Sequence, residues 1–385
     1  MAKKKNKDDY YLASQWTLMV RKLKKHKLAK ISFFILAFLY IIALFGDFFA
    51  PYGIQSFNIT YKNTSPTTIH WVYEGKFIGP YVYKLNKTTI NRMDEYLAGT
   101  LTDVSKITET IIEEDTSEYY KVKFFVHGES YKILGFIPCD LHFFGVPEGS
   151  NGGTEARIYL FGGDISGNDL LSRIILGGRI SLSIPFASAF ISFFLGVLLG
   201  GLSGYFGGVL DMIIQRIIEV IGAVPQIPLW MAFSAAIPPG VSTVRMYVYI
   251  TIILSFINWT GMARIVRGKF LSLKNEDYVM AARLAGVSTW SIIWKHLVPG
   301  FMSYLIVSLT LGIPGSIVGE TSMSYLGLGI KAPATSWGVL LNEAGTVTDI
   351  AAYPWKLIPI IFVTLTVLAY NFLGDGLRDA ADPYK

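Results

Sequence analysis

The chain has very little of two things that soluble proteins use freely, cysteine and charge. Cys139 is the only cysteine among 385 residues, so no disulfide can form within the chain. Charged residues make up 16% of the sequence, whereas soluble domains carry about 25%. Hydrophobic residues make up 52%, and the mean hydropathy is +0.43. This composition excludes a disulfide scaffold and favours a membrane protein.

The sequence also lacks the motifs of nucleotide, metal and hydrolase chemistry. Residues 267–269 (Arg-Gly-Lys) end like a phosphate-binding loop. However, position 263 is Ala, and Phe270 replaces the hydroxyl residue that would bind magnesium. The five histidines are scattered, so His296 is expected to be interfacial rather than a metal ligand, and neither GxSxG nor HExxH occurs. We expect no catalysis, no metal site and no cofactor in this chain.

Six long apolar runs dominate the sequence. A helix of about 20 apolar residues spans the hydrocarbon core of a bilayer, and lipid offers no partner to an open backbone, so each run should be helical. The first run begins too far into the chain and is too long for a cleaved signal peptide. The third contains Pro225 and Pro228, which membrane helices tolerate when neighbours compensate. The predicted fold is an all-α polytopic membrane protein with transmembrane helices at 31–49, 180–202, 220–237, 246–262, 301–319 and 355–373.

The second run is preceded by apolar residues at helical spacing, namely Leu170, Leu171, Ile174 and Ile175. This spacing predicts an amphipathic helix on the outer membrane surface. The alternative is a simple extension of the second transmembrane helix. Residues 166–385 would then form a core of five transmembrane helices.

The distribution of basic residues predicts the orientation. Residues 1–30 contain ten Lys or Arg against Asp8 and Asp9, which places this end in the cytoplasm. A nucleic-acid-binding arm is the alternative, but a basic run directly before a membrane span already has anionic lipid as its partner. Alternation then puts residues 50–165 outside, and it puts residues 263–299 and the C-terminus inside.

Residues 50–165 form the only soluble-looking block. Two stretches, 67–85 and 119–136, are rich in β-branched and aromatic residues, and His-Gly-Glu at 127–129 resembles a hairpin turn. Residues 91–114 are more helix-like. The sequence therefore predicts an α+β or β-rich extracytoplasmic insert between helices 1 and 2. Its aromatic residues are expected to form a core, with a peptide-binding surface as the alternative.

Polar residues near the ends of the apolar runs are candidates for function. Glu219, Glu320 and Asp375 lie at such ends. A carboxylate within the membrane is costly and points to function, although a water-exposed role at a helix end is the alternative. We predict that Ser308, Ser316 and Glu320 line an aqueous path, while small polar residues would equally promote helix packing.

The loop between the fourth and fifth runs, 275–300, reads NEDYVMAARLAGVSTWSIIWKHLVPG. It predicts a helix over 276–284 with Asn275 as its N-cap, acidic residues at its positive end and Gly286 as its stop. Ser288 can cap a second helix over 289–297. A helix–glycine–helix elbow between two spans can transmit a push, whereas an ordinary amphipathic loop helix is the alternative. The face expected to approach a partner closely consists of Tyr278, Ala281, Ala282 and Ala285.

This loop resembles the EAA loop of the membrane subunits of ATP-driven (ABC) importers. One departure is Met280, which stands where that motif has its Glu. Similar family segments occur at 167–181 (GNDLLSRIILGGRIS), 204–211 (GYFGGVLD), 325–328, 336–338 and 374–383 (GDGLRDAADP). Together they resemble the C-type permeases of oligopeptide, dipeptide and nickel importers, and within these the YejE-like subgroup.

The resemblance implies a non-catalytic permease subunit in the cell membrane that works by alternating access. Its expected partners are a B-type permease, two ABC ATPases that carry ATP-Mg, an extracytoplasmic solute-binding protein, membrane lipid and a peptide substrate, but no nucleic acid. The residues that would couple to the ATPases are Glu276, Asp277, Tyr278, Ala281, Ala282, Arg283, Gly286 and Pro299. Nickel or another small solute is the alternative substrate. A membrane receptor is a weaker alternative, because the sequence offers no large cytoplasmic output domain.

Overall fold

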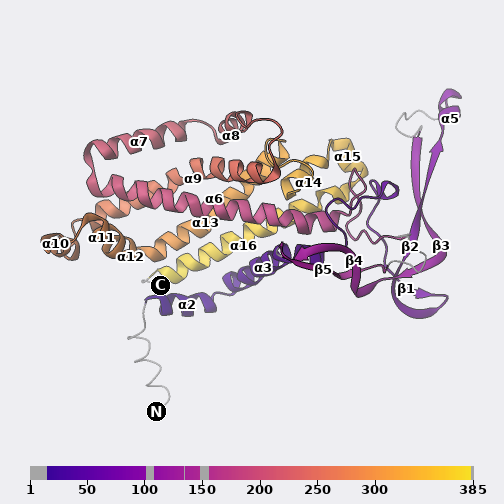
Figure 1. Ribbon diagram of the computed structural model, residues 1–385, viewed down its shortest axis with the longest axis horizontal. Coiled ribbons are helices and arrows are strands. Elements are labelled where there is room, and N and C mark those ends of the chain that lie inside the picture. The colour runs from indigo at the N-terminus through magenta and orange to yellow at the C-terminus, as the bar shows by residue number, and fades with distance from the viewer. Residues whose placement is uncertain (1–14, 101–107, 134, 148–155, 383–385) are drawn as a thin grey trace, which may run out of the picture. The chain divides into compact units, whose positions relative to one another are not determined.

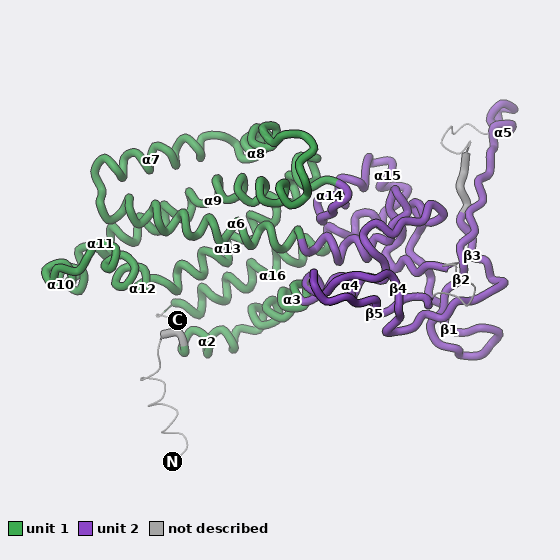
Figure 2. The backbone as a smooth tube through the Cα atoms, in the orientation of Figure 1, with its two compact units in different colours: residues 1–40, 180–331, 361–385 green, residues 41–179, 332–360 purple. Residues whose placement is uncertain are grey.

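The computed structural model describes residues 15–100, 108–133, 135–147 and 156–382. The chain divides into two compact units (Figure 2). Unit 1 comprises Met1–Tyr40, Ile180–Lys331 and Ile361–Lys385, and unit 2 comprises Ile41–Arg179 and Ala332–Ile360. In the described residues unit 1 is helical, and unit 2 holds the strands (Figure 1). The predicted insert, 50–165, falls within unit 2.

The long helices of unit 1 account for the apolar runs. Five of the helices in the described residues are long and apolar enough to cross a membrane, which makes this a mostly helical polytopic membrane protein. Helices α3, α6 and α16 continue across the boundary into unit 2. The helices are α2 (Gln15–Lys25), α3 (Lys27–Leu44), α6 (Leu170–Phe206), α7 (Gly208–Ala223), α8 (Gln226–Ala235), α9 (Thr243–Leu273), α13 (Met302–Tyr325) and α16 (Ile358–Ala381).

The prediction of a single helix over 220–237 is wrong, because a break falls within it. Helices α7 and α8 meet there at 94°, so the pair is a broken span or a re-entrant loop. Val224 has φ −90° and ψ 129°, and Pro225 follows it. Proline disfavours helical backbone at the preceding residue and has no N–H to donate, which accounts for the end of α7 at this point. The described residues therefore contain five single-helix spans, or six if the bent pair counts as one.

The predicted surface helix before the second span is also wrong. Leu170 begins α6, which continues without a break to Phe206 over 37 residues. At 1.5 Å per residue this helix is about 55 Å long, well beyond a hydrocarbon core of about 30 Å. The alternative, an extension of the second span, is what the structure has.

Three glycines of α6 allow it to approach α9 closely. Gly196, Gly200 and Gly204 are four residues apart, so they lie on one face of the helix. A Cβ added at these positions would collide with Met262, Ala263 or Phe270 of α9. Rows of small residues permit this backbone-to-backbone packing in membrane proteins, where apolar side chains gain nothing by leaving lipid.

A second contact region in unit 1 joins α3, α6, α13 and α16. Its buried residues include Leu36, Ala189, Ile317 and Ala369. The hydroxyl oxygens of Tyr40 and Tyr370 lie 2.7 Å apart, and Tyr40 also donates to the backbone oxygen of Leu182. Buried hydroxyls thus find partners on neighbouring helices, as the apolar surroundings require.

Unit 2 contains two small antiparallel sheets. The first has the order β1–β2–β3, and the second is the β4–β5 hairpin. Strands β2 and β3 form a long arm with a short helix, α5 (Met93–Leu97), beyond β2 (Figure 1). The strands are β1 (His70–Tyr73), β2 (Lys76–Asn91), β3 (Thr108–Lys121), β4 (Lys123–Ile133) and β5 (Ile137–Gly145).

Two local expectations for this region are wrong. Residues 127–129 do not form the hairpin turn, because β4 runs through them and the turn lies between Ile133 and Ile137. The pairing of β4 with β5 shifts between His127 and Tyr131, so Gly128 marks an irregularity within the strand rather than its end. Within 91–114, α5 is the only helix among the described residues, and the stretch ends in β3.

Short helices and a buried ion pair complete unit 2. The guanidinium of Arg173, 7% exposed, pairs with Asp164 and Glu343. The indole N–H of Trp337 donates to the backbone oxygen of Ile174 at 3.0 Å. These contacts hold residues 332–360 against the start of α6. The short helices are α4 (Gly46–Phe49), α14 (Trp337–Glu343), α15 (Val347–Ala352) and the 3-10 turns Ile59–Tyr61 and Pro354–Leu357.

Candidate functional site

The predicted elbow lies at one end of the unit 1 helices, between α9 and α13 (Figure 1). It consists of α10 (Asp277–Leu284), α11 (Thr289–Ser291), a π-helical stretch (Ile292–Leu297) and α12 (Val298–Gly300). The last three follow one another directly and lead into α13. The predicted second helix over 289–297 is therefore present, and it is longer than expected.

The start of α10 differs from the expectation. Glu276 rather than Asn275 occupies the N-cap position, and its side chain makes no capping hydrogen bond. Asp277 is the acidic residue of the first turn, where the helix dipole favours it. Partial burial and the nearby Glu276 carboxylate raise the pKa of the Tyr278 hydroxyl above its ordinary value.

The end of α10 is as predicted, because Gly286 stops the helix. Its φ is +74°, a left-handed conformation that favours glycine. The N–H of Gly286 donates to the oxygen of Arg283, and the N–H of Val287 donates to the oxygen of Ala282, both at 3.1 Å. This pair of hydrogen bonds is a Schellman motif. Ser288 then caps the next helix, as predicted, by accepting from the N–H of Ser291 at 3.4 Å.

One face of the elbow is buried in the core of unit 1. Val279 is fully buried and Ala282 is 9% exposed. They share a cluster with Phe270 of α9, Leu305 of α13 and Val197 of α6. The elbow therefore packs directly on three of the long helices. Side-chain contacts run without a break from α10 to these helices, so they can transmit a displacement of α10.

This burial overturns the grouping of four residues on one partner-facing side. Ala282 faces the interior, whereas Tyr278, Ala281 and Ala285 are exposed. Successive residues of a helix differ by about 100° in direction, so Ala281 and Ala282 cannot share one narrow face. Among the other predicted coupling residues, Glu276, Asp277, Gly286 and Pro299 are exposed.

The last coupling candidate, Arg283, is also exposed but reaches back to the bundle. Its guanidinium lies 5.4 Å from the centre of the Tyr205 ring at the end of α6.

Sequence reasoning missed the large apolar residues that the elbow leaves exposed. Their hydrophobicity in an otherwise polar loop was the available signal. They are Met280 (42% exposed), Leu284 (87%), Trp290 (55%) and Trp294 (41%).

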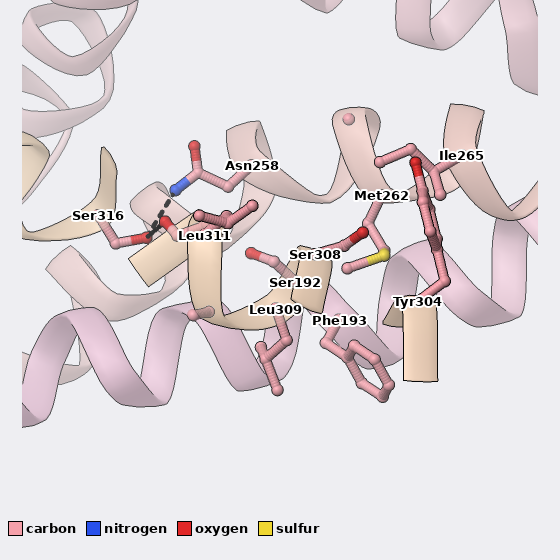
Figure 3. Close-up of a pocket in the computed structure, with 13 residues that line it drawn as sticks. Ser192, Phe193, Asn258, Met262, Ile265, Tyr304, Ser308, Leu309, Leu311 and Ser316 are labelled. Atoms are coloured by element: carbon pink, nitrogen blue, oxygen red, sulfur yellow. Dashed lines mark hydrogen bonds between the residues drawn. The ribbon is translucent and has the colours of Figure 1, made fainter. Parts of the chain in front are cut away.

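A cavity of about 370 Å³ opens between α6, α9 and α13 in unit 1 (Figure 3). Ser308 and Ser316, two of the predicted path residues, line it. The amide nitrogen of Asn258 donates to the hydroxyl oxygen of Ser316 at 3.1 Å. Asn258 was missed, although an amide within an apolar run is a signal in its own right. The other lining residues are Ala189, Ser192, Phe193, Gly261, Met262, Ile265, Tyr304, Leu309, Leu311 and Gly312.

Glu320 does not line this cavity, although it was predicted to share a path with Ser308 and Ser316. Its side chain is fully buried. One carboxylate oxygen accepts from the Ser324 hydroxyl at 2.8 Å, and the other accepts from the Ser181 hydroxyl at 3.3 Å. The Glu320 carboxylate therefore links α13 to α6 through hydrogen bonds.

Comparison with known proteins identifies the family. Residues 196–384 match the model of the binding-protein-dependent transport system inner membrane component. Residues 14–66 match the N-terminal TM domain of oligopeptide transport permease C. The dipeptide transport system permease protein DppC of Bacillus subtilis (strain 168) is 32% identical over 364 residues, which cover 94% of this chain and 84% of that relative. The chain belongs to the family of binding-protein-dependent transport permeases.

Other permeases of this family match a shorter part of the chain at higher identity. The oligopeptide transport system permease protein OppC of Salmonella typhimurium is 43% identical over 226 residues, covering 58% of this chain and 72% of that relative. OppC of Bacillus subtilis is 39% identical over 229 residues, covering 59% and 72%. A chain of the inward-facing MetNI methionine ABC transporter aligns with 54% of this permease and with 96% of its own length, at 19% identity and a TM-score of 0.41. This TM-score and this identity are too low to support a functional conclusion.

Proposed function

We propose that this permease is a non-catalytic subunit of an ATP-driven importer of oligopeptides, that it forms half of the translocation path, and that it couples to ATPase subunits through residues 275–300. The names of the relatives, which are dipeptide and oligopeptide permeases, support the substrate class. The observation that carries the coupling role is the two-faced elbow, with one face in the core of the long helices and the other bearing exposed apolar residues.

The exposed face of the elbow suits a protein partner better than water. Leu284 is 87% exposed, and Trp290 and Trp294 add further apolar area. Large apolar groups clustered on an otherwise polar surface are typical of an interaction site. We infer that this face enters a groove on a cytoplasmic ATPase that holds ATP-Mg. We also propose that both chain termini lie in the cytoplasm, which requires the bent α7–α8 pair to cross the membrane as one span.

The buried face explains how movement of the ATPase would reach the membrane. Val279 and Ala282 contact the cluster that joins α6, α9 and α13. Because a close-packed core transmits displacement instead of absorbing it, a shift of α10 would move the helices that line the cavity. A B-type permease would complete the path, and an extracytoplasmic solute-binding protein would deliver the peptide.

The lining of the cavity favours a peptide over nickel. The lining combines apolar side chains with hydroxyl groups and the Asn258 amide, which can hydrogen-bond to a peptide backbone. None of the thirteen residues that line it in the described chain is His, Cys, Asp or Glu. Nickel binds preferentially to imidazole and similar donor groups. We therefore place nickel second, and the YejE-like subgroup stays a prediction.

The coupling role is tested by one charge substitution with a matched control. Leu284→Lys puts a charge on the most exposed apolar residue of the elbow, whereas Val347→Lys does the same at an equally exposed residue (84%) of α15 in unit 2. We expect Leu284→Lys to reduce co-purification of the ATPases at least tenfold and to abolish peptide uptake, with normal amounts of permease in the membrane. Val347→Lys should retain both. Equal ATPase recovery with the two variants would refute the coupling assignment.

A further inference from the structure

Two neighbouring phenylalanines of the β4–β5 hairpin are both exposed. Phe124 and Phe125 are each 62% exposed. Their ring centres lie 5.5 and 6.0 Å from that of Phe143 on β5, so both rings contact the same partner ring. In a regular strand, successive side chains point to opposite faces. Here two neighbouring residues of one strand are both exposed and share one aromatic partner, so they form a connected apolar cluster.

The backbone of Phe125 departs from strand geometry. Its φ is +57°, in the left-handed region that bulky residues rarely adopt. This conformation is strained for an L-residue, because its Cβ comes too close to the following carbonyl oxygen. Strain of this kind is found most often at functional sites, where the conformation itself is needed. Here the strained residue belongs to the exposed aromatic cluster.

The phenylalanines continue the surface of the first membrane helix. The ring of Phe48 in α4 lies 6.3 Å from that of Phe125 and 5.9 Å from that of Phe143. Helix α4 begins at Gly46, two residues after α3, the first candidate span, ends. Ile41 and Leu44 in the last turn of α3 are 51% and 52% exposed, as side chains that face lipid should be. The apolar surface thus runs from the span onto the hairpin within unit 2.

We propose that Phe48, Phe124, Phe125 and Phe143, here called the phenylalanine patch, insert into the membrane interface beside the first span and anchor the β4–β5 hairpin to lipid. Phenylalanine is among the side chains that interfacial segments bury at the boundary between headgroups and acyl chains, and contact with lipid removes an exposed apolar surface from water. Lys123, which is exposed next to Phe124, suits the phosphates of the headgroups. The proposal needs only that α3 spans a membrane, so it stands apart from the substrate and from ATPase coupling.

Site-directed spin labels can test the depth of the patch. On a Cys139→Ser background, a nitroxide is attached at Phe124→Cys or at Phe125→Cys. A third variant, His127→Cys, serves as the control, because its 75% exposed side chain lies on the same strand outside the patch. The full-length permease is placed in nanodiscs of phosphatidylcholine and phosphatidylglycerol. Collision rates are then measured with oxygen, which is enriched in lipid, and with a water-soluble nickel chelate.

We expect labels at 124 and 125 to favour oxygen over the nickel chelate several-fold, and the label at 127 to show the reverse. A fluorophore at the same two positions should be quenched by lipids that carry a shallow doxyl group, and this quenching should vanish in detergent without such lipids. Equal access of the nickel chelate to all three positions would overturn the proposal. Protection that appears only when a solute-binding protein is added, without quenching by doxyl lipid, would overturn it in favour of a protein partner.

Discussion

The guanidinium of Arg267 donates two parallel hydrogen bonds, each 2.6 Å long, to the carboxylate of Asp211. Paired bonds of this kind fix orientation as well as distance. Asp211 also accepts a hydrogen bond from the Ser203 hydroxyl. The ion pair therefore holds the first turn of α7 against α9 and close to the end of α6. It fixes the start of the bent α7–α8 pair, next to the apolar cluster in which Ile214 and Ile218 of α7 pack against α9.

Breaking this ion pair should loosen α7. Asp211→Asn leaves the Arg267 charge without its partner, and hydrogen bonds to charged groups contribute about 1.5–3 kcal/mol. We expect a clear fall in the melting temperature of the detergent-solubilised permease, followed by fluorescence-detected size-exclusion chromatography. The double variant Asp211→Leu/Arg267→Met, which removes both charges, should lie closer to wild type. If the double variant is the less stable of the two, the ion pair is not what holds α7.

Neighbouring alanines of the elbow should respond differently to the same substitution. Ala282→Arg forces a charge into the cluster around Val279, so we expect misfolding and little permease in the membrane. Ala281→Arg adds a charge to the exposed side, where folding should change by less than about 0.5 kcal/mol. It should nevertheless weaken ATPase association. Membrane yield and ATPase co-purification, measured together, separate these effects, and similar yields for both variants would contradict the burial of Ala282.

The glycine at the elbow should tolerate asparagine much better than valine. At a φ of +74°, a β-branched side chain is strained, whereas asparagine enters the left-handed region more readily. A Cβ at Gly286 would meet no atom within 4 Å, so only the backbone conformation is tested. We expect Gly286→Val to lose about 1–2 kcal/mol locally and most substrate-stimulated ATP hydrolysis in proteoliposomes. Gly286→Asn should keep most of that activity, and equal activity of the two would argue against a structural need for glycine.

Filling the cavity should block transport without disturbing the assembly. Gly312 lines the cavity, and a Cβ there would meet nothing within 4 Å. We expect Gly312→Trp to abolish peptide uptake while ATPase co-purification stays normal. Ile361→Trp, at a residue of α16 that is 62% exposed and does not line the cavity, is the control. Normal uptake by Gly312→Trp would show that this cavity is not part of the path.

The orientation of the insert is open to a labelling test. Leu97 on α5 is 75% exposed, so a cysteine there should be reactive. On a Cys139→Ser background, Leu97→Cys should react with a membrane-impermeant maleimide in intact cells or spheroplasts. Leu284→Cys on the elbow should react only after lysis, because the two positions are expected on opposite sides of the membrane. Labelling in the reverse order would overturn the assigned topology.

Apolar run length and local capping signals determined much of this protein from the sequence alone. Spans one, two, four, five and six follow from runs of about 20 apolar residues, and the structure has a helix for each. The end of α10 at Gly286 and the cap at Ser288 also follow from local chemistry. Such features depend on residues close together in the chain, so they can be predicted without knowing the fold.

The tertiary structure decided which way the side chains face. Ala281 and Ala282 look alike in the sequence, yet only packing against α6, α9 and α13 buries the second one. Glu320 and Ser316 lie on the same helix, but only Ser316 meets the cavity. The left-handed Phe125 could not be foreseen either, since no local rule favours it. Packing between distant segments sets these outcomes, because burial is a property of the assembled helices and strands and not of any one segment.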